Sequence, residues 1–177
     1  MRIGLIRHFE VIHSSQRILN SEEFKGWVRL YDIADVWEIP VDLGDNNWDL
    51  CFSSDLPRAI QTAQSICSCK IVTTDCLREV PISPIHNTHL KLPVPLWLGL
   101  GRMAWLFSQY SQPEIRIQTV KRINGFLTYI LSLKESNILL VTHGFLMALI
   151  RKELLSNGFR GERFVKARNG TLYIFQK

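Results

Sequence analysis

Residues 138–144, with the sequence ILLVTHG, decide the fold class of this 177-residue chain. The unbroken apolar run from Ile138 to Val141 is typical of a strand that is buried on both faces of a parallel sheet. Thr142-His143-Gly144 ends the run, and apolar residues at helical spacing follow it to about Leu155. A buried strand that ends in polar residues and leads into a helix is the repeating unit of α/β proteins.

The same unit recurs earlier in the chain. Ile3–Ile6 ends on Arg7-His8, Leu50–Phe52 ends on Ser53-Ser54-Asp55 before a helix that Pro57 opens, and Ile71-Val72 is a further short strand. Helical periods also cover residues 21–38 and a stretch ending near residue 134. The pattern predicts an α/β fold, with a mostly parallel sheet and helices on both faces.

Two further features complete the predicted organisation. Asn169-Gly170 predicts a C-terminal hairpin between strands at 164–168 and 172–175. Four of the seven prolines fall within residues 80–96, which indicates a loop. We find no repeat or linker, so we expect one domain over residues 1–177, in which 80–110 is a substrate lid or insertion.

Composition narrows the class of protein. Hydrophobic residues make up 46% and charged residues 21%, so the chain has enough apolar surface for a packed core. No apolar run approaches the ~20 residues of a membrane span, and Arg7 interrupts the N-terminal apolar stretch too early for a signal peptide. The four cysteines are interpreted as reduced thiols. We therefore expect a soluble cytoplasmic protein, with no membrane partner.

Charge is unevenly spread along the chain. Residues 1–88 hold 8 basic and 12 acidic side chains, whereas residues 89–177 hold 13 and 4. This excess indicates an anionic partner. Nucleic acid is one candidate, but aromatic residues do not alternate with the basic residues of 151–177 in a stacking pattern. We interpret that stretch as a solvated face and expect no nucleic-acid partner.

Chemically useful side chains follow four of the predicted strands. Ligands of open α/β sheets bind beyond the carboxyl ends of the strands. The residues expected to meet at that edge are Arg7, His8, Arg58, Glu79 and His143. Arginine forks match phosphate oxygens, a neutral imidazole can attack phosphorus, and a carboxyl group can protonate a leaving oxygen. The amides of a helix beginning at Gly144 would add further phosphate donors. This set predicts phosphoryl transfer that needs no metal.

These residues lie in motifs that resemble a known family. Residues 5–10 (LIRHFE) resemble the Arg-His-Gly-Glu signature of the histidine phosphatase superfamily, the phosphoglycerate mutase-like proteins. Residues 53–63 (SSDLPRAIQTA), 77–79 (LRE) and 141–144 (VTHG) are similar to its later motifs, in the family's order. The resemblance implies a phosphoglycerate mutase-like fold. It also implies His8 as the phosphorylated nucleophile, Glu79 as the proton donor, and a phosphoryl clamp formed by Arg7, Arg58 and His143.

The chain departs from the family pattern at several positions. Phe9 replaces the family's glycine and is expected either to narrow the pocket or to stand beside the substrate. Ser14 falls where the family has an asparagine, and Arg17 is a further candidate substrate contact. Within the proline-rich loop, His86 is expected to reach the substrate as part of the lid. Gly144 completes the predicted substrate-binding set.

A zinc site is an alternative interpretation of three cysteines and two loop histidines. Cys67, Cys69, Cys76 and the pair His86 and His89 lack the spacing of a zinc knuckle, so no metal and no cofactor are predicted. We expect a metal-independent phosphomonoesterase that acts on a small-molecule phosphate ester as a monomer or homodimer. The alternatives are a phosphoglycerate-type mutase, a phosphoprotein phosphatase, and a phosphate-ligand binding protein without turnover.

Overall fold

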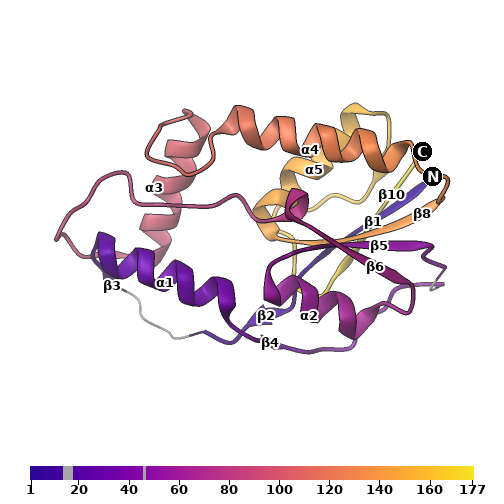
Figure 1. Cartoon of the computed structure of the whole chain (residues 1–177), viewed down its shortest axis with the longest axis horizontal. Coiled ribbons are helices and arrows are strands. Elements are labelled where there is room, and N and C mark those ends of the chain that lie inside the picture. Colours follow the sequence, from indigo (N-terminus) through magenta and orange to yellow (C-terminus); the bar gives the residue numbers. More distant parts are fainter. Residues whose placement is uncertain (14–17, 46) are drawn as a thin grey trace.

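A six-stranded sheet forms the centre of the computed structural model, which describes residues 1–13, 18–45 and 47–177 (Figure 1). Its first four strands are parallel to one another, whereas the last two are antiparallel additions at one edge. In sheet order the strands are β6 (Lys70–Thr74), β5 (Leu50–Ser54), β8 (Asn137–Thr142), β1 (Arg2–Arg7), β10 (Leu172–Gln176) and β9 (Arg160–Gly161). The predicted mostly parallel sheet is confirmed.

Helices cover both faces of the sheet, as predicted. Helices α4 (Arg116–Leu131) and α5 (Gly144–Ser156) lie on one face, and α2 (Pro57–Ile66) lies on the other (Figure 1). Successive strand residues point to opposite faces. Ile138 and Leu140 of β8 therefore pack in the core beneath α4 and α5, whereas Leu139 and Val141 pack in the core beneath α2. This double burial explains the continuous apolar runs.

A second layer of structure lies beyond the carboxyl ends of the parallel strands. Helices α1 (Ser21–Ile33) and α3 (Val94–Leu106) occupy this end of the molecule (Figure 1). Phe24 and Trp97 join them through stacked rings whose centroids are 5.5 Å apart. Smaller elements support this end: β2 (Glu10–Val11) pairs with β4 (Val36–Trp37), β3 (Ile18–Leu19) pairs with β7 (Leu92–Pro93), and η1 (Asp75–Leu77) follows β6.

Helix α3 was not predicted, because Pro95, Gly99 and Gly101 lower the helix propensity of its sequence. Tertiary packing overrides this propensity. Trp97, Ala104 and Trp105 are buried on its inner side, and a proline is tolerated in the first helical turn. Residues 80–91 are irregular, as the prolines indicated.

Two predicted boundaries were wrong. The helix expected over 21–38 ends at Ile33, because residues 36–37 pair with β2 instead. At the C-terminus two antiparallel strands do form, but the outer one is Arg160–Gly161 rather than 164–168. Asn169 bridges instead to Arg7 of β1, and Gly170 turns the chain with φ of +61°. This places the turn against the strand that carries His8.

Within these described ranges, no helix is both long and apolar enough to cross a membrane.

Candidate active site

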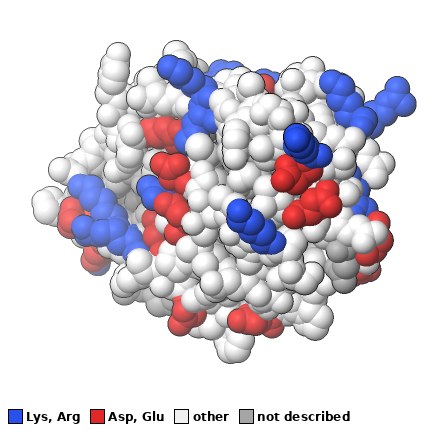
Figure 2. Space-filling view, turned by 45° about the vertical axis from the view of Figure 1, so that its right-hand side comes forward, with Lys and Arg blue, Asp and Glu red and all other residues white. Residues whose placement is uncertain are grey.

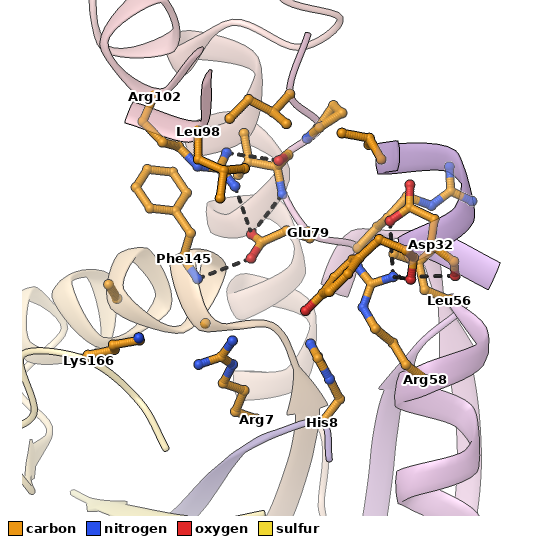
Figure 3. A pocket seen from close by; sticks show the side chains of 18 of the residues that line it. Arg7, His8, Asp32, Leu56, Arg58, Glu79, Leu98, Arg102, Phe145 and Lys166 are labelled. Atoms are coloured by element: carbon orange, nitrogen blue, oxygen red, sulfur yellow. Dashed lines mark hydrogen bonds and ion pairs between the residues drawn. The ribbon is translucent and has the colours of Figure 1, made fainter. Parts of the chain in front are cut away.

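A cavity of about 500 Å³ opens beyond the carboxyl ends of β1 and β5, between α1, α3 and the start of α5 (Figure 3). Arg7, His8, Arg58, Glu79 and Gly144 all line it. His143 lies directly behind His8, with ring centroids 5.1 Å apart. Five residues predicted to follow four strands are thus brought to one cavity, and His143 lies against it.

The His8 ring is held in one tautomer. Its Nδ1 lies 2.6 Å from the carbonyl oxygen of Phe9. A carbonyl can only accept a hydrogen bond, so Nδ1 carries the proton and Nε2 of the neutral ring is bare. Burial and, to a lesser degree, the charges of Arg58 and Arg7 lower the pKa of His8 to about 3, although the hydrogen bond to the Phe9 carbonyl acts in the opposite direction. At neutral pH, His8 therefore presents a nucleophilic nitrogen.

Arg58 is buried and fixed by several acceptors. Its Nη1 donates to the carboxylate of Asp32 at 3.0 Å and to main-chain carbonyls at the end of α1. Its Nε donates to Nδ1 of His143 at 3.3 Å. Nε2 of His143 must then carry the proton, and it donates to the hydroxyl of Ser54 at 2.9 Å.

The family resemblance implied that His143 is part of the phosphoryl clamp, but its ring has no free nitrogen for a phosphoryl oxygen in this structure. Both ring nitrogens already have protein partners, Arg58 and Ser54. Burial lowers the pKa of His143 well below its usual value, and the neighbouring His8 and Arg58 lower it further. In this geometry His143 is a neutral ring that orients Arg58.

Arg7 reaches the cavity because of a glycine at the start of α5. A side-chain Cβ at position 144 would lie 3.1 Å from Nε of Arg7, closer than ordinary packing allows. Arg7 donates from Nη1 to the carbonyl of Ala167 at 3.0 Å. Among the described residues, its buried Nε has no hydrogen-bond partner. Gly144 thus makes room for the Arg7 guanidinium beside the start of α5.

Glu79 caps helix α5. Its Oε1 accepts from the amides of Val80 at 2.9 Å and Leu146 at 3.1 Å, and its Oε2 accepts from the amide of Phe145 at 3.1 Å (Figure 3). The expected use of these α5 amides as phosphate donors is therefore wrong for this geometry. Two carboxylate oxygens offer about four acceptor positions, so one position on Oε2 stays open beside the cavity.

A family model of the histidine phosphatase superfamily (branch 1) matches residues 35–176. The chain belongs to this superfamily. The match begins after Arg7 and His8, so for these two residues the family motif is supported by their placement beside Arg58 and His143 in the structure. A search of curated protein sequences finds no match.

Solved structures show the same histidine phosphatase fold. An α-ribazole phosphatase from Shigella flexneri has a TM-score of 0.61 and 20% identity, over 98% of this chain and 89% of that chain. A proposed α-ribazole-5′-phosphate phosphatase from Escherichia coli has a TM-score of 0.64 and 18% identity, over the same shares. A mycobacterial glucosyl-3-phosphoglycerate phosphatase has a TM-score of 0.58 and 22% identity, over 88% and 82%.

Four predicted substrate contacts of this histidine phosphatase do not line the cavity or cannot be placed. Phe9 is fully buried in the interior, where its main-chain amide donates to Thr62, so it neither narrows the pocket nor stands beside a substrate. His86 is exposed and lies outside the cavity lining, because residues 80–91 carry it away from the strand ends. Ser14 and Arg17 lie outside the described residues.

The cavity also contains residues that the sequence did not single out. Tyr31 and Asp32 come from α1, Arg102 from α3, and Phe145 from α5. Lys166 comes from the loop before β10, and its ammonium group points toward the guanidinium of Arg7 (Figure 3). Sequence signals for these residues were weak, because the helical period of 21–38 indicated only burial, and Lys166 belonged to a stretch that we interpreted as solvated.

On the face shown in Figure 2, Lys and Arg side chains are interspersed with Asp and Glu. Across the part of the chain that the structure describes, no three His, Cys, Asp or Glu side chains are grouped to hold a metal ion.

Proposed function

We propose that this histidine phosphatase hydrolyses a small-molecule phosphate monoester through a phosphohistidine at His8, without a metal. The observation that carries the proposal is the His8 ring itself. It is neutral, its Nδ1 proton is bound to the Phe9 carbonyl at 2.6 Å, and it lines a cavity between two arginines. A nucleophile with this tautomer needs no general base, because its attacking nitrogen is already unprotonated.

Arg7 and Arg58 would bind the phosphoryl oxygens. No described residue accepts a hydrogen bond from Nη2 of either guanidinium. Charge-assisted bonds from arginine to phosphate oxygens are stronger than neutral ones, and they stabilise the charge that develops in phosphoryl transfer. Lys166 would add a third positive charge from the side of Arg7.

The first step transfers the phosphoryl group to the enzyme. Nε2 of His8 attacks phosphorus, a P–N bond forms, and the bond from phosphorus to the ester oxygen breaks. The leaving oxygen takes a proton from Glu79, for which we propose the open position on Oε2. The Nδ1 proton stays on the ring and remains bonded to the Phe9 carbonyl throughout.

The second step returns the enzyme to its starting state. A water molecule attacks phosphorus, gives a proton to the Glu79 carboxylate, and displaces Nε2 of His8 as the P–N bond breaks. Inorganic phosphate leaves. Residues Val80 to Ile82 and helix α3 line the opposite side of the cavity, which supports the prediction that 80–110 covers the substrate.

Two of the structurally similar proteins are phosphatases of small-molecule phosphates: the α-ribazole phosphatase and the glucosyl-3-phosphoglycerate phosphatase. These descriptions favour a small-molecule phosphate ester over a phosphoprotein as the substrate.

Rapid quenching tests the proposal. The chain is mixed with a ³²P-labelled aryl phosphate and quenched in alkali, where phosphohistidine survives while phosphoserine is lost. We expect acid-labile label on the protein, absent from His8→Ala and unchanged in His89→Ala, because His89 is exposed and outside this cavity. Turnover should persist in EDTA. Retention of both label and turnover in His8→Ala would refute the proposal.

A further inference from the structure

The part of the cavity away from His8 is apolar. Its walls are formed by Trp27 and Val28 of α1, Ile82, Leu98 of α3, and Phe145 and Ala148 of α5. We infer, on the basis of the proposed function, that the alcohol portion of the substrate is an uncharged apolar group, and preferentially an aromatic one. The phosphoryl group would lie at His8, and the apolar group would fill the space between α1, α3 and α5.

Three charged side chains around this space already have partners, whereas the buried indole N–H of Trp27 has none among the described residues. Asp32 binds Arg58 at 3.0 Å, and Arg78 binds Asp55 through Nε at 3.0 Å. Glu79 accepts three main-chain amides. A hydroxyl-rich alcohol such as a sugar would therefore lose its bonds to water and gain few in return. Binding is weaker when a buried hydroxyl has no hydrogen-bond partner than when an apolar group of the same size takes its place.

Arg102 is also occupied. Its Nη1 donates to the carbonyl of Val80 at 2.8 Å, and its guanidinium lies 4.1 Å from the ring centroid of Phe145. The pKa of Arg102 is lowered by burial. The guanidinium thus stacks on an aromatic wall rather than offering a free charge to a substrate.

The charges that line the cavity also favour an uncharged alcohol portion of the substrate. Of the cations lining the cavity, Arg7 and Lys166 have no carboxylate partner among the described residues. Both lie at the phosphoryl end (Figure 3). Two positive charges match the charge of a phosphate monoester dianion, so no cation is left for a second anionic group. The half-exposed carboxylate of Asp32 would repel such a group.

Aromatic side chains make the α1 wall suited to a flat group. Trp27 and Tyr31 are stacked with ring centroids 5.4 Å apart, and Trp27 stacks in turn on Phe24 at 6.1 Å. Neighbouring rings in this row are nearly parallel, with interplanar angles of 9° and 18°. A flat aromatic substrate gains both area burial and ring contacts from such a wall.

Three esters of primary alcohols test the inference, since their leaving groups have comparable chemistry: benzyl phosphate, glucose 6-phosphate and 3-phosphoglycerate. We expect kcat/KM for benzyl phosphate to exceed that for each of the others at least about tenfold. Equal or reversed preference would overturn the inference while leaving the proposed function intact. Failure to hydrolyse any of the three esters would overturn both.

A matched pair of variants on α3 locates the source of the preference. Leu98 lines the cavity, whereas Leu96 is 47% exposed on the outer side of the same helix. Leu98→Asn should lower the ratio of benzyl phosphate to glucose 6-phosphate turnover several-fold, and Leu96→Asn should leave the ratio unchanged. An equal effect of both variants on the ratio would contradict the assignment. If Leu98→Asn does not fold by circular dichroism, Val28→Thr adds a hydroxyl to the α1 wall with little change of shape, and it should lower the same ratio.

Discussion

Arg58 donates from Nε to Nδ1 of His143 across 3.3 Å, and this one bond determines which nitrogen of His143 carries a proton. An arginine cannot accept a hydrogen bond, so the proton must lie on Nε2, which faces Ser54. Arg58 lies in the first turn of α2, which follows β5, and His143 directly follows β8, the neighbour of β5 in the sheet. Their contact fixes the proposed phosphate-binding arginine relative to the proposed nucleophile.

Ser54 is expected to act through this pair. Ser54→Ala removes the acceptor for the Nε2 proton of His143, so the ring and Arg58 lose their fixed orientation. We expect kcat to fall at least about tenfold. The proposed reason is positioning, so the pH profile of kcat/KM should change shape as the buried ring gains freedom to turn.

Ser53 provides the matched control. It is equally buried, and its hydroxyl donates to the main-chain carbonyl of Ser54 at 2.9 Å without touching either histidine. Each serine-to-alanine change should lower the free energy of unfolding by about 1 kcal/mol, measured in urea. Similar losses of activity in both variants would show that Ser54 has only a structural role.

Glu79 is expected to combine catalysis with helix capping. Glu79→Gln keeps an amide oxygen that can accept from α5 but removes the acid proton. For an alkyl phosphate we expect kcat to fall about 10²- to 10⁴-fold. For 4-nitrophenyl phosphate the fall should be much smaller, because that leaving group needs no proton.

Glu79→Ala separates the two roles. It removes the cap as well as the proton donor, so it should lower stability by about 1 kcal/mol more than Glu79→Gln does. If Glu79→Gln lowers kcat by the same factor for the alkyl phosphate and for 4-nitrophenyl phosphate, another group supplies the proton.

Stability should fall on mild acidification because of His8. Its pKa is about 3 in the folded protein, whereas the ordinary pKa of histidine is 6.5, so between these values the unfolded chain binds a proton that the folded chain does not. The free energy of unfolding therefore rises with pH across this interval and is highest above it. The free energy of unfolding should therefore be roughly 2 kcal/mol lower at pH 5 than at pH 7. Urea unfolding at the two pH values should show a smaller difference in His8→Asn than in the parent chain.

Phe9 is expected to matter for stability and not for substrate choice. It is fully buried, so Phe9→Ala should cost about 3–5 kcal/mol of folding free energy. Phe107→Ala, at a position 68% exposed, should cost less than about 0.5 kcal/mol. Under conditions where both variants are folded, KM should match that of the parent chain. A KM that changes in Phe9→Ala but not in Phe107→Ala would show that Phe9 does affect substrate binding.

Much of the fold could be predicted because the sequence carries strong local signals for it. The apolar runs of β1, β5 and β8 are short, unbroken and followed by polar residues, which only a parallel sheet buried on both faces explains. Helix α3 could not be predicted in the same way. Its stability comes from Trp97 and Trp105 packing against residues distant in sequence, and this packing outweighs unfavourable local propensity.

The site residues also differ in how far the sequence predicts their positions. His8, Arg58 and Glu79 follow predicted strands closely, so the sheet edge was enough to bring them together. Asp32 and Lys166 enter the cavity from the end of α1 and from a loop, and no strand position indicates where they point. The position of His86 was wrong for a related reason, because an irregular segment rich in proline gives no period from which a direction can be inferred.

The C-terminal turn has a consequence for the order of events during synthesis. Asn169 donates from its side chain to the carbonyl of His8 at 2.7 Å, and the amide of Gly170 donates to the carbonyl of Arg7 at 2.9 Å. These bonds join positions 160 or more residues apart, so they form only after residue 170 has left the ribosome. Loop closure over such a separation comes late in folding. The main-chain carbonyls of Arg7 and His8 therefore gain these partners only when residues 169 and 170 fold back onto β1.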